Sequence, residues 1–344
     1  MSARPAEALD AAAVDAWLKP RIAGLRGEPA VTQFHGGASN WTYRLQYPSH
    51  DLVLRRPPTG TKAKSSHDMG REYRVQKALA PLFPYVPEMM AYCEDARVIG
   101  VEFYVMRTLD GLIPRAKWGV QLDKTTIRKL CLNVVDVWVK LHQVDVAKAG
   151  LSDLSKGAGY ARRQVEGWSD RYTQARTWNV RSFARVIDWL KERIPADVAT
   201  CVIHNDFRFD NVVLDVNEPT RVIGVLDWEM ATLGDPLMDL GAGLAYWVQA
   251  DDDFLGRATR RQPTHLPGML TRDEVVAYYC DKRGLRADHW PFYEVYGLFR
   301  LAGIAQQIYY RYHRRQTRNP AFKHFWVMTN YLHWRCRQVM RRAR

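Results

Sequence analysis

The segment that most constrains this chain is VIHNDFRFDNVVLD, residues 202–215. In it, His204, Asp206 and Asn211 form an H-x-D-x-x-x-x-N pattern directly after an apolar, β-branched run. A second apolar run, VIGVLD, ends at Asp227, sixteen residues after Asn211. The pattern therefore predicts two short strands, each of which leads into polar side chains.

These residue types suit phosphoryl transfer, which needs a carboxylate near the acceptor hydroxyl and oxygen ligands for Mg²⁺ at the phosphates. Asp206 is the candidate catalytic base, and Asn211 and Asp227 are the candidate magnesium ligands. His204 is expected to hold the loop together through hydrogen bonds, and Arg208 is counted with it among the catalytic residues. The alternative interpretation is that the polar residues of the motif only form turns between strands.

The composition is that of a globular protein with a large core. Hydrophobic residues make up 47% and charged residues 25% of the 344 residues, enough for one two-lobed domain or two ordinary domains. The five cysteines form no C-x-x-C pair, which argues against a disulfide framework and favours reduced thiols in the cytoplasm. Neither a signal peptide nor an apolar run of about 18 residues is expected to target the chain to a membrane.

The N-terminal part, residues 29–107, is predicted to be mainly β because it consists of short alternating or β-branched runs separated by turn residues. One helix is expected within it, over residues 67–80, and an amphipathic helix is expected before it. The expected strands are 29–35, 41–47, 51–56, one centred on Val98 with Gly100 near its turn, and 101–106.

From about residue 112 the pattern becomes helical, apart from the β segment 200–227. Thr271 and Glu274 have the spacing of a capping box at the start of one helix. The fold class is therefore α+β, with a small β-rich N-terminal lobe over 1–110 and a larger, mainly helical catalytic lobe over 111–344. The expected helices are 125–144, 157–178, 181–194, one or more from 236, 290–313 and 319–341.

Several segments carry a family resemblance. HNDFRFDN (204–211) and VLDWEMATLGDPLMDLG (225–241) resemble the aminoglycoside-phosphotransferase-like kinases. The resemblance spans residues 28–330 and implies a two-lobed protein-kinase-like fold, use of ATP and Mg²⁺, and a hydroxyl acceptor. Five further segments resemble the branch found as the kinase domain of acyl-CoA dehydrogenase fusion proteins: GGASNWTYRL (36–45), LVLRRPPTG (52–60), REYRVQKAL (71–79), ARRQVEGW (161–168) and FRLAGIAQQIYYRY (299–312).

By this resemblance the motif residues keep the roles given above, and Asp239 is expected to brace the catalytic loop. Glu229 stands where protein kinases carry the glycine of their Asp-Phe-Gly motif. It is a candidate ligand of a second magnesium ion, or alternatively a surface or substrate-facing residue. The chain departs from the family at Asn205, where many of these kinases have glycine, and this change is not expected to inactivate the loop.

The resemblance also places the nucleotide in the N-terminal lobe. Arg55 stands where protein kinases have the strand lysine, with Arg56 as the alternative, and Glu72 is its expected ion-pair partner. The backbone from Met106 to Gly111 is expected to connect the lobes and to bind the adenine. The alternatives are a plain hairpin turn for the glycines and surface charges for the rest. The expected phosphate-covering residues are Gly36, Gly37, Ala38, Ser39 and Asn40.

The net charge of +13 indicates the acceptor class. From Val295 to the end the chain has 11 Lys and Arg and no Asp or Glu. Because a polycationic acceptor requires an acidic site, this basic segment favours an anionic acceptor, such as a hydroxy acid or a hydroxyacyl-CoA. Arg300, Arg311 and Arg315 are expected to share one helical side at this site, and the alternative is a solvent-facing stripe.

Three other functions are kept open. The first is a kinase for an aminoglycoside, a macrolide or an amino alcohol, and the second is a catalytically silent kinase-like binding protein. The third is binding of nucleic acid or anionic membrane through the basic tail, which is disfavoured because no nucleic-acid module is recognised. The expected partner is thus a small molecule, without nucleic acid or membrane. The resemblance leaves open a functional link to an acyl-CoA dehydrogenase, and a monomer and a homodimer are both compatible with the sequence.

Overall fold

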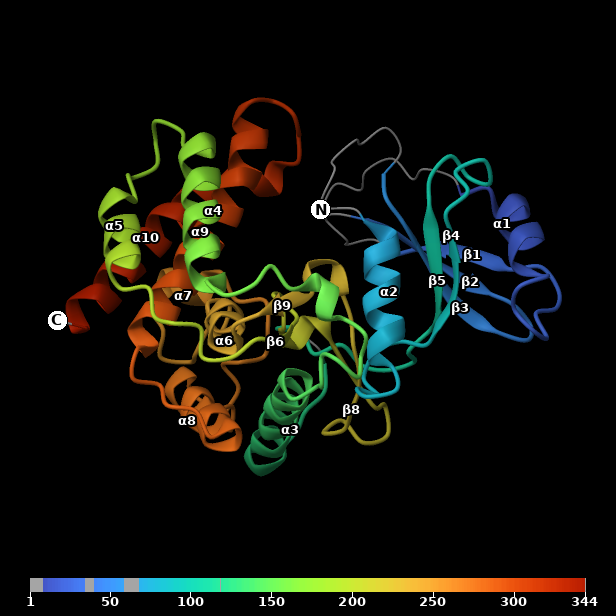
Figure 1. Ribbon diagram of the computed structural model, residues 1–344, viewed down its shortest axis with the longest axis horizontal. Coiled ribbons are helices and arrows are strands. Elements are labelled where there is room, and N and C mark those ends of the chain that lie inside the picture. Colours follow the sequence, from blue (N-terminus) through green and yellow to red (C-terminus); the bar gives the residue numbers. More distant parts are fainter. Residues whose placement is uncertain (1–8, 35–39, 59–67, 118, 344) are drawn as a thin grey trace.

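The computed structural model describes residues 9–34, 40–58, 68–117 and 119–343. The chain forms two lobes, a smaller one built on a β-sheet and a larger one built from helices (Figure 1). This arrangement confirms the α+β fold class and the order of the lobes. The isolated β-bridge between Leu112 and Leu214 fixes the chain to the large lobe soon after it leaves the sheet.

The sheet of the small lobe is antiparallel throughout, with the strand order β1-β2-β3-β5-β4. Consecutive strands are therefore neighbours except where the chain passes through α2 between β3 and β4. The strands are β1 (Ala30–Gln33), β2 (Trp41–Gln46), β3 (Asp51–Arg56), β4 (Met89–Cys93) and β5 (Phe103–Arg107).

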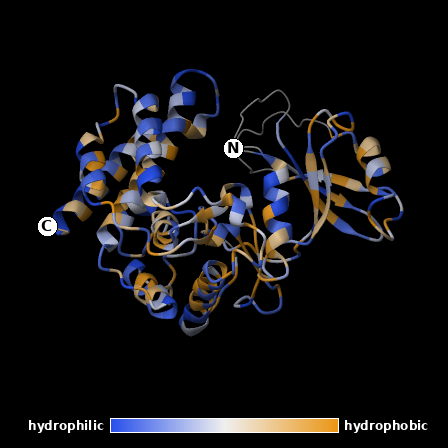
Figure 2. Ribbon diagram, in the orientation of Figure 1, coloured by the Kyte–Doolittle hydropathy of each residue, from blue (hydrophilic) through white to orange (hydrophobic). Residues whose placement is uncertain are grey.

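A helix covers each face of this sheet. The helix α1 (Ala11–Leu18) packs on the face that carries Leu52 and Leu54, and α2 (Met69–Leu79) packs on the face that carries Val53. Because side chains alternate between the two faces along a strand, β3 contributes to both apolar clusters. Figure 2 shows hydrophobic and hydrophilic stretches in these strands, and the buried positions lie mainly in β3, β4 and β5.

The strand expected around Val98 is wrong. The structure places the partner of β5 earlier, at Met89–Cys93. Val98 and Gly100 instead lie in a turn, where the Val98 N–H donates to Asp95 O and Gly100 has a φ of 83°. The sequence of Met89–Cys93 does not predict a strand, because its apolar and polar residues do not alternate. Its pairing with β5 is also irregular, with a register shift between Met89 and Ala91.

In the large lobe, the long helix α9 (Trp290–His313) lies at the centre, and α4, α6 and α10 pack against it. This lobe also contains the two-stranded sheets β6–β9 and β7–β8, which confirms the expected β segment around residues 200–227. None of the described helices is long and apolar enough to cross a membrane. The other elements are α3 (Lys124–His142), α4 (Tyr160–Ala175), α5 (Ala184–Glu192), β6 (Cys201–Ile203), β7 (Val212–Leu214), β8 (Val222–Val225), β9 (Thr232–Gly234), α6 (Pro236–Leu244), α7 (Phe254–Ala258), α8 (Arg272–Arg283) and α10 (Phe325–Arg342).

The helix α8 begins as its sequence predicts. The Thr271 side chain accepts a hydrogen bond from the Glu274 N–H at 3.1 Å, and the Glu274 carboxylate accepts one from the Thr271 N–H at 2.8 Å. Two of the backbone donors that a helix start leaves unpaired are satisfied in this way.

Candidate active site

The loop between β6 and β7 carries the central motif and is held from inside by His204. The imidazole is fully buried, and its Nδ1 accepts the Asp206 N–H at 3.2 Å. Its Nε2 therefore carries the proton and donates to Leu226 O at 3.0 Å, next to Asp227. Burial lowers the pKa of His204, which favours the neutral ring that this pattern needs. His204 thus joins the loop to the end of β8 by hydrogen bonds.

Asp239, at the first turns of α6, fixes the same loop through its backbone. Its Oδ1 accepts the Asn205 N–H at 2.6 Å, and its Oδ2 accepts the His204 N–H at 3.2 Å. Two side chains of α3 also donate to Oδ2, Trp138 Nε1 at 2.9 Å and His142 Nε2 at 3.0 Å. Burial opposes ionisation of Asp239, but these hydrogen bonds outweigh it and lower its pKa. Asp239 therefore braces the loop as a buried carboxylate.

Asn205 stands where many kinases of the family have glycine, and it adopts a backbone conformation that glycine favours. Its φ is 64°, in the left-handed region where glycine is preferred and asparagine is tolerated better than most residues. Its side chain also donates to Met230 O at 3.1 Å and accepts from Tyr160 OH at 3.2 Å. Asparagine is thus compatible with the backbone that glycine would otherwise supply.

The Asp206 carboxylate lies in a largely buried position and is held on both oxygens. Arg208 contacts Oδ1 through Nε at 3.0 Å and Oδ2 through Nη2 at 3.1 Å. Asn211 Nδ2 also donates to Oδ2, at 3.0 Å. Burial raises the pKa of Asp206 to about 6, against the opposing effect of the Arg208 charge. A carboxylate with a pKa in this range can exist in either protonation state near neutral pH, as a general base requires.

The Arg208 guanidinium is fixed in turn by its surroundings. It lies 4.5 Å from the centroid of the Tyr246 ring and contacts Asp210 at 3.4 Å. Arg208 therefore positions the Asp206 carboxylate in this structure.

Two of the predicted metal ligands face one cation from the small lobe. Asp227 Oδ1 lies 3.2 Å and Glu229 Oε2 lies 3.9 Å from Arg55 Nη2. Asp227 follows β8 with a φ of 67°, a strained conformation of the kind found at functional sites. Asn211 uses its Nδ2 on Asp206, which leaves its Oδ1 as the end that can bind a metal. Among the described residues, no group of three or more His, Cys, Asp or Glu is arranged as a metal site.

The structure distinguishes the two neighbouring arginines of β3. Arg55 points to the α2 face, where it pairs with Glu72 at 2.6 Å and with Asp227. Glu72 is almost completely buried and also accepts from Tyr104 OH at 2.8 Å. Arg56 points to the opposite face, where it contacts Tyr43. The alternation along a strand thus brings Arg55 to the other site residues.

The structure places only some of the other residues predicted for the nucleotide site. Gly36, Gly37 and Ser39 lie outside the described residues, as does Ala38. Asn40 is buried, and its Nδ2 donates to Glu229 Oε2 at 3.2 Å. Met106 lies inside β5, opposite Val53 and Met89, so the segment that leaves the sheet begins only after Arg107.

Arg300 of α9 lies on the large-lobe side of the catalytic loop. It is 2% exposed, and its Nη2 donates to Asn205 O at 2.8 Å. Its guanidinium carbon lies 5.4 Å from the centroid of the Trp168 ring, and its charge acts on Asp206. Among the described residues, no carboxylate forms an ion pair with it. The expectation that Arg315 shares one helical side with Arg300 and Arg311 is wrong, because the helix ends at His313. Arg311 lies eleven residues after Arg300 in the same helix, but it is exposed whereas Arg300 is buried.

Sequence reasoning missed Trp138 and His142 as partners of Asp239. Both lie on α3, four residues apart, and so point from the same side of that helix. A polar ring next to a tryptophan within an otherwise apolar stripe was the available signal. This pattern does not indicate that the partner is Asp239, because Asp239 lies about one hundred residues further along the chain.

Comparisons with known proteins give the family of the chain. The model of the phosphotransferase enzyme family matches residues 30–275. Acyl-CoA dehydrogenase family member 11 of Rattus norvegicus is 34% identical over 316 residues, which cover 90% of this chain and 40% of the relative. The chain thus spans less than half the length of that curated relative.

Two solved structures share the fold. The crystal structure of an aminoglycoside phosphotransferase candidate from Ralstonia eutropha has a TM-score of 0.79 and 30% identity, and the match covers 96% of this chain and 99% of the other. A spectinomycin phosphotransferase in complex with ADP and spectinomycin has a TM-score of 0.60 and 15% identity, with 96% and 100% covered. The chain therefore belongs to the phosphotransferase enzyme family and has its kinase-like fold.

Proposed function

We propose that this protein transfers the γ-phosphoryl group of ATP, with Mg²⁺, to a hydroxyl group of a small anionic acceptor. A hydroxy acid or a hydroxyacyl-CoA is the acceptor class that fits best. The single observation that carries the choice of acceptor is Arg300, a buried cation beside the catalytic loop without a carboxylate partner among the described residues.

The nucleotide side of the proposal rests on Arg55. Its guanidinium is held by Glu72 and reaches Asp227, so it stands at the border of the two lobes as a fixed cation. Such a group can bind phosphate oxygens in bidentate fashion. The spectinomycin phosphotransferase that shares the fold was solved with ADP, which supports an adenine nucleotide here.

The residues present fit a magnesium ion. Asn211 Oδ1 and the Asp227 carboxylate would hold it, with Glu229 as a further oxygen donor, and phosphate oxygens would complete its ligands. When bound, Mg²⁺ neutralises the charge that gathers on the transferred group and its leaving oxygens. These oxygen donors are the ligands that this hard cation prefers.

In the chemical step, the acceptor hydroxyl oxygen forms a bond to the γ-phosphorus while the bond between that phosphorus and the bridging oxygen of ADP breaks. The hydroxyl proton passes to an oxygen of Asp206, and ADP leaves with the bridging oxygen. Asn211 and Arg208 orient the Asp206 carboxylate, and His204 and Asp239 fix the backbone around it. The protein thus contributes mainly position and charge, as is typical of phosphoryl transfer.

The acceptor charge follows from the cost of burying a cation. A guanidinium that is 2% exposed loses most of its hydration. A hydrogen bond to the Asn205 carbonyl, a contact with Met230 Sδ at 3.6 Å and an aromatic neighbour compensate for this only in part. An acceptor carboxylate or phosphate near Arg300 would supply the missing counter-charge. The charge of Arg300 also acts on Asp206, so an anion bound there would lie near the base.

The names of the relatives suggest which enzyme class shares its substrates with this protein. The rat relative is named as an acyl-CoA dehydrogenase family member, and this chain matches 40% of it. We therefore extend the proposal to a functional link with an acyl-CoA dehydrogenase, on the same or another chain, and to an acyl thioester as one form of the acceptor.

The test measures magnesium-dependent release of ADP from ATP by the wild type, Asp206→Asn and Arg300→Gln. The acceptor panel contains hydroxy acids of increasing chain length, their coenzyme A thioesters, choline and kanamycin. We expect ADP release that an anionic acceptor stimulates, that Asp206→Asn abolishes, and that needs more acceptor in Arg300→Gln. Faster turnover of choline or kanamycin would refute the anionic acceptor, and failure to bind Mg-ATP at millimolar concentration would refute the kinase itself.

A further inference from the structure

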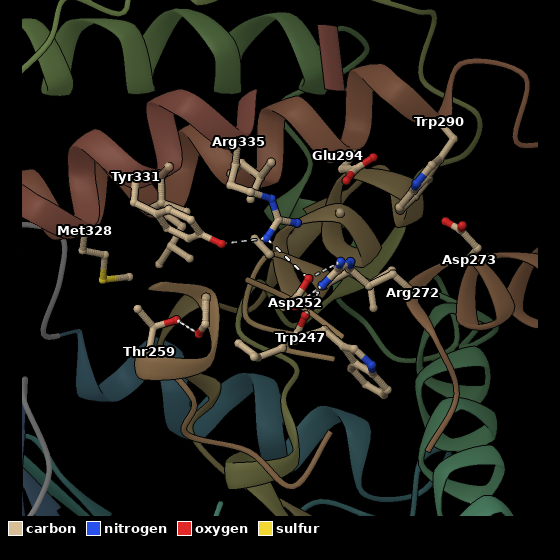
Figure 3. Close-up of a pocket in the computed structure, with 18 residues that line it drawn as sticks. Trp247, Asp252, Thr259, Arg272, Asp273, Trp290, Glu294, Met328, Tyr331 and Arg335 are labelled. Carbon is tan, nitrogen blue, oxygen red and sulfur yellow. Dashed lines mark hydrogen bonds and ion pairs between the residues drawn. The ribbon is translucent and has the colours of Figure 1, made fainter. Parts of the chain in front are cut away.

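The large lobe contains a pocket that is separate from the catalytic residues. It lies between α6, α8, α9 and α10 and is partly open to solvent (Figure 3). On α9 it is lined by Glu294, Leu298 and Leu301, whereas Arg300 points from another face of that helix to the catalytic loop. No residue that lines it contacts Asp206 in the described part of the chain.

Two opposite charges face this pocket without pairing. Glu294 of α9 and Arg335 of α10 both line it, but no ion pair within 4.0 Å joins them. Within the described residues, Glu294 has no hydrogen bond or ion pair at all. Burial raises the pKa of Glu294, as expected for a carboxyl group that has lost water without gaining a partner.

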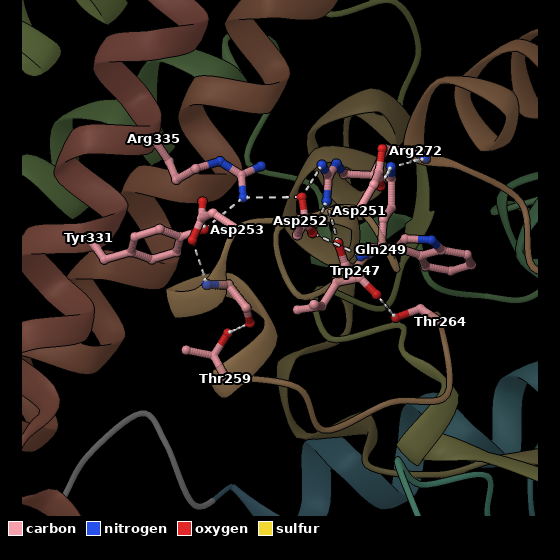
Figure 4. Close-up of polar contacts among 12 residues, drawn as sticks. Trp247, Gln249, Asp251, Asp252, Asp253, Thr259, Thr264, Arg272, Tyr331 and Arg335 are labelled. Carbon is pink, nitrogen blue, oxygen red and sulfur yellow. Dashed lines mark hydrogen bonds and ion pairs between the residues drawn. The ribbon is translucent and has the colours of Figure 1, made fainter. Parts of the chain in front are cut away.

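Of the other charged groups of the pocket, Asp252 and Arg272 pair with each other, and Asp273 is exposed to solvent. Asp252 binds both Nη atoms of Arg272 at 2.7 Å, and Arg272 Nη1 also donates to Trp247 O at 2.7 Å (Figure 4). Arg335 uses only Nη1, on Tyr331 OH at 3.1 Å and, more weakly, on Asp252 at 3.7 Å. The Nε and Nη2 donors of Arg335 have no partner among the described residues. The half-buried Glu294 carboxyl and one edge of the Arg335 guanidinium thus remain for a ligand, whereas the exposed Asp273 carboxylate stays hydrated.

The rest of the lining is suited to an apolar body. Leu298, Leu301 and Leu332 are buried beneath the pocket, and Trp290 and Met328 flank it. An apolar wall with a few convergent polar groups is the usual composition of a small-molecule site between helices. A ligand that fills the space and bridges the two charges needs a donor for Glu294 and an acceptor for Arg335.

We propose that this pocket binds a small zwitterion of the α-amino-acid type, with its ammonium group on Glu294, its carboxylate on Arg335 and an apolar side chain on the leucine wall. The ammonium and carboxylate of such a ligand match the Glu294 carboxyl and the Nε and Nη2 edge of Arg335, and the ligand is neutral overall. The site is independent of the proposed kinase reaction because it uses none of the residues placed in that reaction.

The test is calorimetric titration of the full chain with L-leucine at concentrations up to about 10 mM. In parallel, 3-methylbutylamine lacks the carboxylate, 4-methylpentanoate lacks the ammonium group, and glycine lacks the side chain. We expect L-leucine to bind and each of the three partial ligands to bind at least about tenfold more weakly, since each loses one charged hydrogen-bonding group or the apolar contact.

The variants Glu294→Gln and Arg335→Lys keep the size of the side chains, and their melting temperatures show whether they fold. We expect each to weaken L-leucine binding by about tenfold. The control Arg300→Gln should leave it unchanged, because L-leucine bound at the proposed acceptor site would depend on that residue instead. The proposal is overturned if no titration shows binding, which would mean a pocket that holds only water, if 4-methylpentanoate binds as well as L-leucine, or if only Arg300→Gln reduces binding.

Discussion

Asp239→Asn is the substitution that tests most directly how the catalytic loop is held. Asp239 accepts four hydrogen bonds, from the backbone of His204 and Asn205 and from the side chains of Trp138 and His142. Asparagine has nearly the same shape but only one oxygen, so it cannot accept from both sides. The change therefore alters the hydrogen bonding of the loop and leaves the packing almost intact.

The expected loss follows from the geometry. The best orientation keeps the asparagine oxygen where three donors meet, and places its amide nitrogen against the Asn205 N–H, now accepted at 2.6 Å. The hydrogen bond from the Asn205 N–H to the charged carboxylate is lost, and this N–H then faces the asparagine amide group, which is also a donor. A hydrogen bond to a charged group contributes about 1.5–3 kcal/mol, so we expect the free energy of unfolding to fall by about 3 kcal/mol. For a chain of 344 residues this lowers the melting temperature by about 4 °C.

Thermal unfolding and steady-state kinetics measure the two consequences. The melting temperature should fall as above, and kcat, measured well below it, should fall by about tenfold to a hundredfold because the backbone around Asp206 shifts. The exposed substitution Glu192→Gln is the control and should change neither quantity. The reasoning is refuted if Asp239→Asn melts within about 1 °C of the wild type and retains its kcat.

Three further predictions follow from the same site. Asp206→Asn should lower kcat by about 10² to 10⁴ while Mg-ATP still binds, measured by ADP release and nucleotide titration, and unchanged kcat would exclude Asp206 as the base. Arg55→Lys should raise the KM for ATP by about tenfold, whereas Arg56→Lys on the opposite face should leave it unchanged; equal effects would contradict the assignment. For His142, burial lowers the pKa in the folded state, so the unfolded chain binds a proton first as pH falls below about 6.5. The stability of the wild type relative to His142→Asn should therefore decrease between pH 7.5 and 5.5, by up to about 1.4 kcal/mol per pH unit in denaturant titrations, and a constant difference would contradict this.

The local part of this site could be predicted because it depends on short-range rules. The motif fixes the spacing of His204, Asp206 and Asn211, and the apolar runs around it became β6 and β7. The choice between Arg55 and Arg56 was also within reach. Residues on the Val53 side of β3 face α2, and strand alternation places Arg55 with Val53 and Arg56 with Leu54. The sequence left this open only because it did not show which face α2 would cover.

The brace of the loop could not be predicted, because it depends on the packing of distant elements. Trp138 and His142 meet Asp239 only after α3 and α6 come together around the loop. Nothing local indicates this, since a helix such as α3 can present one face to many different neighbours. The same holds for Met89–Cys93, which became a strand by pairing with β5 although its own alternation is weak.

The basic C-terminal segment shows why a count of charges does not locate a site. Helical spacing relates Arg300 to Arg311 and Arg315 only if the helix continues and all three have the same surroundings. The helix ends at His313, and α4, α6 and α10 pack around its earlier turns, so Arg300 is enclosed while Arg311 stays exposed. An exposed arginine remains hydrated and interacts only weakly with an anion, whereas an enclosed one without a carboxylate favours an anionic ligand strongly. The single buried Arg300 is therefore a better indication of the acceptor than the net charge of the whole segment.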